Sequence, residues 1–373
     1  MIYFDNAATT GKKPQNVILA VNTALTRFCA NPGRSGHAVS MAAAEQIYKA
    51  RVKIANFFGV QNAEKVIFTA NCTESLNIVI KGVLKQGDTV LISDLEHNAV
   101  MRPLTALDVN CETFETSLLD DEKTVENFAK LLTKKPKMVI CTAASNVLGK
   151  KLPIEKIGKI CRKKGILFCV DAAQIAGIEE INCDKMCIDY LCVAAHKGLY
   201  APMGIGILIA NAPIEKTIIE GGTGTDSINF LQPETLPERF ESGTVNLPAI
   251  MGVSAGIDFI NRVGIKRIRE RENSVIKYIL GGLKQNKKAV LYTPFFDENL
   301  YVPVLSFNLK NINSMETAKL LNYRGIAVRA GLHCAPTAHK KIGTENVGTV
   351  RISPSFYNNV SEAEFLLKTL KNL

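Results

Sequence analysis

The stretch "IEKIGKICRKKGILFCVDA", residues 154–172, indicates which kind of fold to expect. Its first part, residues 154–165, has the amphipathic pattern of a helix and ends at a glycine. Its second part, residues 166–172, is a short apolar run typical of a buried strand. Similar runs, with helical patterns between them, occur at residues 65–70, 88–93, 137–143, 188–194 and 204–210. This alternation predicts an α/β domain in which a mostly parallel sheet carries helices on both faces.

The pattern changes after residue 250. Residues 250–283 have the periodicity of one long helix or of two helices that abut. Strand-like stretches and a C-terminal helix follow, at residues 302–309, 325–331, 349–355 and 361–372. We therefore predict a second, smaller α+β domain. The predicted large domain spans residues 15–261, and the small domain combines residues 1–14 and 262–373.

Composition excludes several classes of protein. The 373 residues carry a formal charge of +10, but the basic residues are dispersed in short runs. Such runs are typical of a solvated surface; the alternative is a basic face that attracts an acidic partner protein or an anionic substrate. No nucleic-acid-binding motif is present. The ten cysteines form no C-x-x-C pair, and most lie in apolar segments as small core residues.

The N-terminal segment "MIYFDNAATT" has no apolar leader, and no apolar run approaches the ~18 residues that a membrane span needs. We therefore expect a cytoplasmic protein that does not contact a membrane.

Polar residues follow the predicted strands. In an open parallel sheet, ligands bind beyond the carboxyl ends of the strands, so these residues are expected to lie together. They include two of the five histidines, His97 and His196, together with Asp171, Gln174 and Lys197. A lone aspartate at such a place is usually a helix cap, and a lone histidine is usually structural. The whole set is harder to explain as caps and predicts a ligand site.

Lys197 indicates the chemistry of that site. Burying an ammonium is costly, whereas a neutral lysine is a nucleophile that forms a Schiff base with an aldehyde. Pyridoxal 5'-phosphate needs such a lysine, a carboxylate for its ring nitrogen, an anion site for its phosphate and a planar group over its ring. Asp171 can supply the carboxylate, and His97 can cover the ring. The helix that opens at Cys72 and Thr73 suits a phosphate.

The motifs resemble the class V aminotransferase family of fold-type I pyridoxal-phosphate enzymes. Within that family they are similar to the cysteine desulfurases and selenocysteine lyases of the NifS/SufS type. The similar segments run in order through nearly the whole chain: "YFDNAATT" (3–10), "NPGRSGH" (31–37), "FTANCTESLN" (68–77), "EHNAV" (96–100), "SNVLG" (145–149), "VDAAQ" (170–174), "AHKGLYAPMGIG" (195–206), "RFESGTVN" (239–246), "VRAGLHCAP" (328–336) and "VRISPSFYN" (350–358).

The resemblance implies an aspartate aminotransferase-like fold with a seven-stranded sheet, a homodimer, and a role for each matching residue. The residues implied to hold pyridoxal 5'-phosphate are Lys197, Asp171, Gln174, His97, Cys72, Thr73, His196 and, from the neighbouring subunit, Thr244. Those implied to bind the substrate carboxylate are Asn146 and Arg351, the arginine through two parallel hydrogen bonds. Those implied to be catalytic are Lys197, His97 and Cys334.

Cys334 distinguishes among the activities of the family. It follows His333 directly, with Arg329 nearby, and an adjacent cation can lower the pKa of a thiol. The resemblance implies that Cys334 attacks the substrate sulfur, so that L-cysteine becomes L-alanine and Cys334 carries a persulfide. The alternative is a small structural residue. A zinc site formed with His333 and His339 is not expected, because H-C-x₄-H is no standard ligand spacing; we predict no metal.

The predicted function is that of a pyridoxal-phosphate-dependent cysteine desulfurase, with sulfur passed to a small thiol or to an acceptor protein. Selenocysteine lyase is the close alternative, followed by another class V aminotransferase or lyase acting on a small amino acid. A non-catalytic scaffold is disfavoured because Lys197 and Asp171 are both present. Ala194, Gly33, Met203 and the segment 221–240 depart from the family pattern. These departures leave open the substrate, the acceptor and the pathway, whether iron–sulfur cluster assembly, tRNA thiolation or selenium supply.

Overall fold

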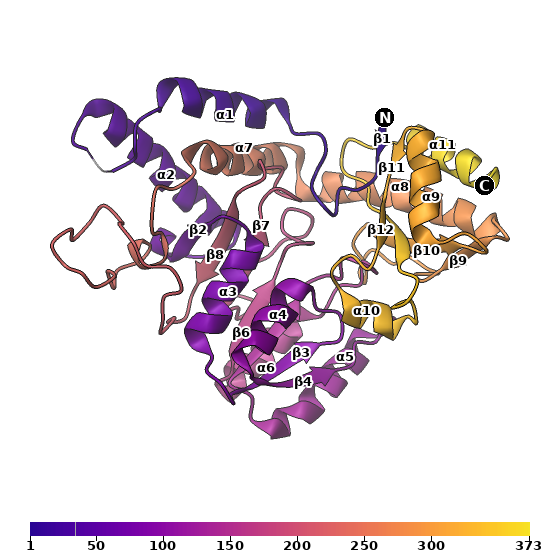
Figure 1. Cartoon of the computed structure of the whole chain (residues 1–373), viewed down its shortest axis with the longest axis horizontal. Helices are drawn as coiled ribbons and strands as arrows, with labels where there is room; N and C mark the ends of the chain where they lie inside the picture. Colours follow the sequence, from indigo (N-terminus) through magenta and orange to yellow (C-terminus); the bar gives the residue numbers. More distant parts are fainter. Residues whose placement is uncertain (34) are drawn as a thin grey trace.

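The computed structural model describes residues 1–33 and 35–373; Arg34 of the "NPGRSGH" segment lies outside the described residues. Its centre is a seven-stranded sheet (Figure 1). The strand order is β2-β8-β7-β6-β5-β3-β4, and only β8 runs antiparallel to its neighbours. The strands are β2 (Val66–Thr69), β3 (Thr89–Ser93), β4 (Asn110–Phe114), β5 (Met138–Thr142), β6 (Leu167–Asp171), β7 (Tyr190–Ala194) and β8 (Gly206–Ala210). The predicted α/β class and mostly parallel sheet are confirmed.

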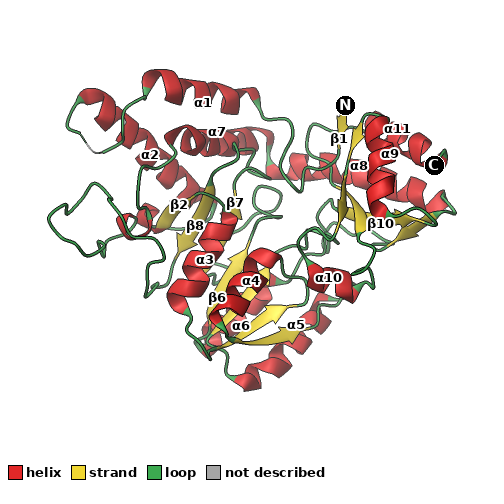
Figure 2. Cartoon of the chain, in the orientation of Figure 1, coloured by secondary structure: helices red, strands yellow, loops and turns green. Residues whose placement is uncertain are grey.

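Helices cover both faces of this sheet (Figure 2). They are α1 (Gln15–Arg27), α2 (Ala38–Phe57), α3 (Cys72–Val83), α4 (Asn98–Leu107), α5 (Asp121–Lys130), α6 (Ile154–Lys164) and α7 (Leu247–Val263), with short 3₁₀ turns at Ala63–Lys65, Leu131–Lys134 and Glu238–Phe240. Alternate residues of every strand except the edge strand β4 pack into two apolar clusters. In β6, Phe168 and Val170 pack into the cluster of α2, α6 and α7, whereas Cys169 packs into that of α3 and α4. Burial on both faces explains why this strand is apolar throughout.

The C-terminal part contains a second, smaller sheet with its own helices. Its four-stranded antiparallel sheet has the order β12-β13-β10-β9, and a short parallel pair joins β1 to β11. The strands are β1 (Ile2–Tyr3), β9 (Ala289–Leu291), β10 (Leu305–Leu309), β11 (Ile326–Ala327), β12 (Arg329–Gly331) and β13 (Thr349–Ile352). The helices are α8 (Ile265–Gln285), α9 (Ser314–Tyr323), α10 (Pro336–Lys341) and α11 (Val360–Lys371).

The N-terminal strand packs with this C-terminal part, since Phe4 belongs to the same apolar cluster as Val275 and Ile352. Residues 250–283 form two helices rather than one, because Gly264 between α7 and α8 has a φ of +88° that ends α7. The predicted domain boundaries at residues 14 and 261 stay a prediction. Among the described residues, no helix has the length and apolar character to cross a membrane.

Candidate functional site

Polar side chains from several strand ends line one cavity of about 110 Å³. Its lining residues are Asn71, Cys72, Thr73, His97, Ala99, Thr142, Asn146, Asp171, Ala173, Gln174, Ala194, His196 and Lys197. The structure therefore brings together most of the residues singled out from the sequence. Cys334, Arg351 and Thr244 are not part of this lining.

Lys197 enters the cavity from the turn after β7. The carbonyl of His196 before it accepts hydrogen bonds from the Thr10 hydroxyl (3.0 Å) and the Lys13 ammonium (2.9 Å). Gly198 after it lies so close to the Ala176 carbonyl oxygen that a Cβ would approach to 2.2 Å. The Lys197 side chain keeps some contact with solvent through the cavity, yet burial lowers the pKa of its ammonium while Asp171 opposes the shift. A lowered pKa increases the fraction of neutral, nucleophilic amine.

Asp171 is the last residue of β6 and is only 3% exposed. Its Oδ1 accepts a hydrogen bond from the Ala173 N–H (2.9 Å) and one from the Cys72 thiol (3.6 Å). Burial, together with the Asp171 charge, raises the pKa of that thiol, so Cys72 is a protonated donor. Among the described residues, no lysine or arginine forms an ion pair with Asp171. A buried carboxylate of this kind suits a cationic N–H of a ligand.

His97 caps the N-terminus of α4. Its Nδ1 accepts the Ala99 N–H at 3.0 Å, so the neutral ring carries its proton on Nε2. Burial lowers the pKa of the His97 imidazole, which favours this neutral form. Gln174 also lines the cavity. Its Nε2 donates a hydrogen bond to the Ala7 carbonyl (3.0 Å), which fixes the side chain at the cavity wall.

The N-terminus of α3 gives the cavity an anion-binding end. Cys72 and Thr73 are the first residues of this helix, where main-chain N–H groups have no helical acceptor. Nearby, His196 has a buried Nδ1 with no hydrogen-bond partner among the described residues. Burial lowers the pKa of His196 to about 4. Ala194 lines the same cavity and offers it a methyl group, which forms no hydrogen bond.

Cys334 lies on a short loop between β12 and α10, and its side chain is exposed. Two hydrogen bonds hold this loop beside the cavity, and a third holds the first turn of α10 that follows it. The Cys334 carbonyl accepts the Asn98 N–H (2.7 Å), and the His333 carbonyl accepts the Asn146 amide (2.7 Å). The Thr337 hydroxyl donates to the carbonyl of Glu96 (3.2 Å). The loop and the start of α10 are therefore bonded to Asn98 and Glu96, the two residues that flank His97.

His333 does not supply the cation expected beside Cys334. Burial, with the nearby Arg351 charge, lowers the pKa of His333 to about 2, so its ring is neutral at physiological pH. The ring is buried, and its Nε2 contacts the Thr349 carbonyl at 3.1 Å. The adjacency of His333 and Cys334 in the chain does not reveal that the histidine side chain faces the interior.

Arg351 is almost fully buried and already has partners. It forms an ion pair with Asp5 (2.8 Å), and its Nη1 donates to the Asn146 carbonyl (3.0 Å). Its Nε–H has no partner among the described residues. Asp5 was not singled out from the sequence, although it lies in the motif "YFDNAATT" that begins the chain.

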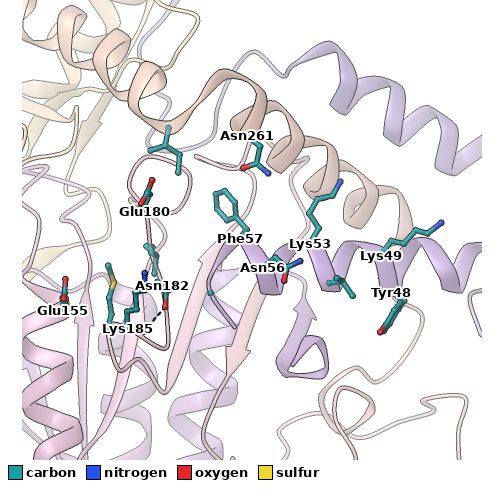
Figure 3. A pocket seen from close by; sticks show the side chains of 15 residues that line it. Tyr48, Lys49, Lys53, Asn56, Phe57, Glu155, Glu180, Asn182, Lys185 and Asn261 are labelled. Carbon is teal, nitrogen blue, oxygen red and sulfur yellow. Dashed lines mark hydrogen bonds between the residues drawn. The ribbon is translucent and has the colours of Figure 1, made fainter. Parts of the chain in front are cut away.

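Thr244 lies apart from the cavity of its own chain. Its exposed hydroxyl receives a 3.5 Å contact from the Asn31 amide, and both residues line a different groove. A larger groove, of about 1030 Å³, is also separate from the Lys197 cavity. Figure 3 shows its wall along α2, with Lys49, Lys53 and Phe57, and no residue is shared with the cavity. The larger volume of this groove therefore does not mark the place where the polar side chains of the strand ends converge.

Comparisons with known proteins show what this chain is similar to. The family description Aminotransferase class-V matches residues 2–366. A probable cysteine desulfurase of Pyrococcus abyssi (strain GE5 / Orsay) is 33% identical over 392 residues, which cover 100% of this chain and 94% of the relative. One of Borreliella burgdorferi (strain ATCC 35210 / DSM 4680 / CIP 102532 / B31) is 33% identical over 393 residues, covering 100% and 92%. The apo structure of cysteine desulfurase from Thermococcus onnurineus NA1 superposes with a TM-score of 0.89 at 33% identity, covering 100% of this chain and 94% of that one.

Proposed function

The chain belongs to the aminotransferase class-V family, and from that premise we propose that it is a pyridoxal 5'-phosphate-dependent cysteine desulfurase. It converts L-cysteine to L-alanine and passes the sulfur to Cys334. The observation that carries the proposal is the placement of an exposed cysteine loop beside the Lys197 cavity. That placement is held by the hydrogen bond between the Asn98 N–H and the Cys334 carbonyl.

The residues of the cavity fit the cofactor. Lys197 offers an amine with a lowered pKa, and Asp171 offers a buried carboxylate without a cationic partner among the described residues. The start of α3 and the unpaired Nδ1 of His196 offer donors for a phosphate. We assign the roles of aldehyde partner to Lys197, ring-nitrogen partner to Asp171, ring-oxygen partner to Gln174 and ring cover to His97. The phosphate partners are Cys72, Thr73, His196 and, from a second subunit, Thr244.

When bound, pyridoxal 5'-phosphate withdraws electrons from the α-carbon of an amino acid. The protein supplies the proton transfers. With the cofactor and substrate bound, Lys197 would be the group that takes the α-proton, and burial favours the neutral amine that this role needs. His97 carries its proton on Nε2 and is the second group able to move one. Asp171 would hold the ring nitrogen of the bound group, where a carboxylate partner favours the protonated nitrogen.

Cys334 performs the sulfur step. Its thiolate attacks the substrate Sγ, an S–S bond forms, and the Cβ–Sγ bond breaks with its electron pair left on Cβ. That carbon takes a proton and leaves as the methyl group of alanine, while Cys334 retains a persulfide. A second thiol, from a small molecule or an acceptor protein, then attacks the persulfide and regenerates Cys334. The exposure of Cys334 allows both the substrate and this second thiol to reach it.

Asn146 and Arg351 are the proposed carboxylate-binding residues. The two terminal nitrogens of Arg351 already bind Asp5 and the Asn146 carbonyl. Each terminal nitrogen has a second N–H, and the Nε–H has no partner among the described residues, so the guanidinium keeps donors for the substrate carboxylate.

We also propose a homodimer. Ile228, Phe230 and Leu231 lie on the long loop between β8 and α7, and all three side chains are exposed. Exposed apolar residues so close together in the chain are typical of a surface covered by a partner. Thr244 is on the same loop, which accounts for its distance from the cavity of its own chain.

The experiment mixes the cofactor-loaded protein with L-cysteine and dithiothreitol and quantifies alanine and sulfide together. Equal amounts of both support the proposal. Absence of alanine, with a change in cofactor absorbance on adding other amino acids, would mean that the substrate is a different amino acid. Selenocysteine as a parallel substrate then separates the lyase alternative, because its reaction survives Cys334→Ala.

A further inference from the structure

The segment Glu96–Asn98 connects β3 to α4 and stands between the sheet and the cysteine loop. The Asn98 N–H donates to the Cys334 carbonyl (2.7 Å), and the Glu96 carbonyl accepts from the Thr337 hydroxyl (3.2 Å). His97 lies between these two anchoring residues and lines the cavity. Whatever fixes this segment therefore fixes both His97 and the Cys334 loop.

The side chain of Glu96 fixes the segment to the sheet. It is fully buried, and its Oε1 accepts hydrogen bonds from the Ser93 hydroxyl (2.5 Å) and the Thr142 N–H (2.8 Å). Ser93 ends β3 and Thr142 ends β5, so the carboxyl joins two adjacent strand ends. Glu96 is not among the residues that line the cavity.

Glu96 has the surroundings of a protonated acid. Among the described residues, no cation pairs with it and its Oε2 has no hydrogen-bond partner. Burial raises the pKa of Glu96 to about 8, the bonds from Ser93 and Thr142 oppose the shift, and the Asp171 charge adds to it. The Glu96 charge in turn adds to the effect of burial in raising the pKa of the Cys141 thiol on β5. A buried, unpaired carboxylate is costly, so the neutral form is the stable one.

We propose that Glu96 is a positioning residue whose buried carboxyl holds His97 at the cavity and the Cys334 loop beside it. Glu96 contacts neither substrate nor cofactor and acts through the main chain of residues 96–98. The inference rests on the proposed function, because only that function requires His97 and Cys334 to lie near the same substrate.

The test compares Glu96→Ala with Glu96→Gln in the cofactor-loaded enzyme. Glu96→Ala removes the acceptor for both donors and lowers kcat for alanine formation about 10-fold or more, with cofactor content unchanged. Glu96→Gln keeps a neutral side chain with an accepting oxygen, so it restores kcat to within about threefold of the original.

A second readout needs no turnover. Amide hydrogen exchange of peptides covering residues 96–100 and 332–337 is faster in Glu96→Ala and unchanged in Glu96→Gln. Thr105→Ala, which removes a side-chain hydrogen bond from the exposed face of α4, is the control and leaves both peptides unchanged. If Glu96→Ala does not fold, Ser93→Ala removes one of the two donors and gives the same comparison with a smaller effect.

Two results would overturn the proposal. In the first, both peptides of Glu96→Ala exchange their amide hydrogens at the rate of the original protein; if that variant does not fold, the same result in Ser93→Ala counts. In the second, Glu96→Gln has a kcat at pH 7 as low as that of Glu96→Ala. A protein that makes no alanine from L-cysteine in any form refutes the proposed function instead, and the exchange data still decide the role of Glu96.

Discussion

The two reactive groups of the site are held in opposite ways. Lys197 follows a strand buried on both faces, and its turn is fixed by a glycine, two threonines and Lys13. Cys334 is exposed, lies on a loop where it and His333 have positive φ, and is held mainly through carbonyl groups. A group that retains a cofactor gains from burial. A group that receives sulfur and hands it on must remain accessible.

The largest effect is expected from removing the Lys197 amine, on the buried side of the site. Lys197→Ala removes both the covalent partner of the cofactor and the proposed base. We expect alanine formation to fall roughly 10²–10⁴-fold, the range typical of a general base, and cofactor absorbance to be lost on dialysis. Absorbance spectra and alanine assays check this, with Lys185→Ala, on the separate groove, as the control. Retained activity in Lys197→Ala would show that the buried side is not the catalytic one.

Removing the thiol is expected to separate chemistry from cofactor binding. In Cys334→Ala, alanine formation from L-cysteine falls roughly 100-fold or more, since the acceptor of the sulfur is lost. Cofactor absorbance stays as in the original, because Cys334 is not part of the cavity lining. Cys111→Ala, an exposed cysteine on β4, is the matched control. Equal alanine formation by Cys334→Ala and Cys111→Ala would show that Cys334 is not the sulfur acceptor.

Burial on the lysine side also predicts how stability depends on pH. Glu272 lines a second, small cavity together with Lys197, and burial raises its pKa to about 8 despite hydrogen bonds from Phe356 and Tyr200. The folded state thus binds this proton more tightly than the unfolded state, whose carboxyl has the ordinary value of 4.5. The free energy of unfolding therefore falls as pH rises from about 4.5 to about 8, by at most about 1.4 kcal/mol per pH unit.

Glu272→Gln removes this contribution. Urea denaturation at pH 6 and pH 9 measures it, and we expect the variant to lose less stability than the original protein over that interval. The same pH dependence in both proteins would show that Glu272 is not protonated in the folded state.

The smallest effect is expected from one contact of the exposed side. Thr337→Val removes the hydroxyl that donates to the Glu96 carbonyl but leaves the Asn98–Cys334 hydrogen bond in place. We expect a fall in kcat of about two- to threefold with unchanged cofactor absorbance, in keeping with the ~1 kcal/mol of one neutral hydrogen bond. Steady-state kinetics with L-cysteine measures it. A loss as large as that of Cys334→Ala would mean that this single bond, rather than the set, holds the loop.

The same contrast explains what could be predicted from the sequence. Lys197, Asp171 and His97 were found because parallel strands bring their carboxyl ends to one edge, so a polar residue after each apolar run predicts a shared site. β4 was missed because its sequence, "NCETF", is polar and mostly exposed at the edge of the sheet. The family resemblance, rather than any periodicity, implied the seventh strand.

The exposed side was less predictable. The contact between Asn98 and Cys334 joins main-chain atoms far apart in the chain, and main-chain hydrogen bonds leave no residue-type signature. The neutral state of His333 depends on its burial against Thr349, which the neighbouring residues do not encode. Glu96 is part of the motif "EHNAV", so its position was visible, but its burial was not.

The central claim is that the exposed Cys334 takes the sulfur while the buried Lys197 side retains the cofactor. The most direct measurement is one turnover of the cofactor-loaded enzyme with L-cysteine and no reductant, followed by alkylation, proteolysis and mass spectrometry. We expect alanine in an amount equal to the active sites and one extra sulfur atom on the peptide containing Cys334. Alanine without extra sulfur on that peptide would contradict the account.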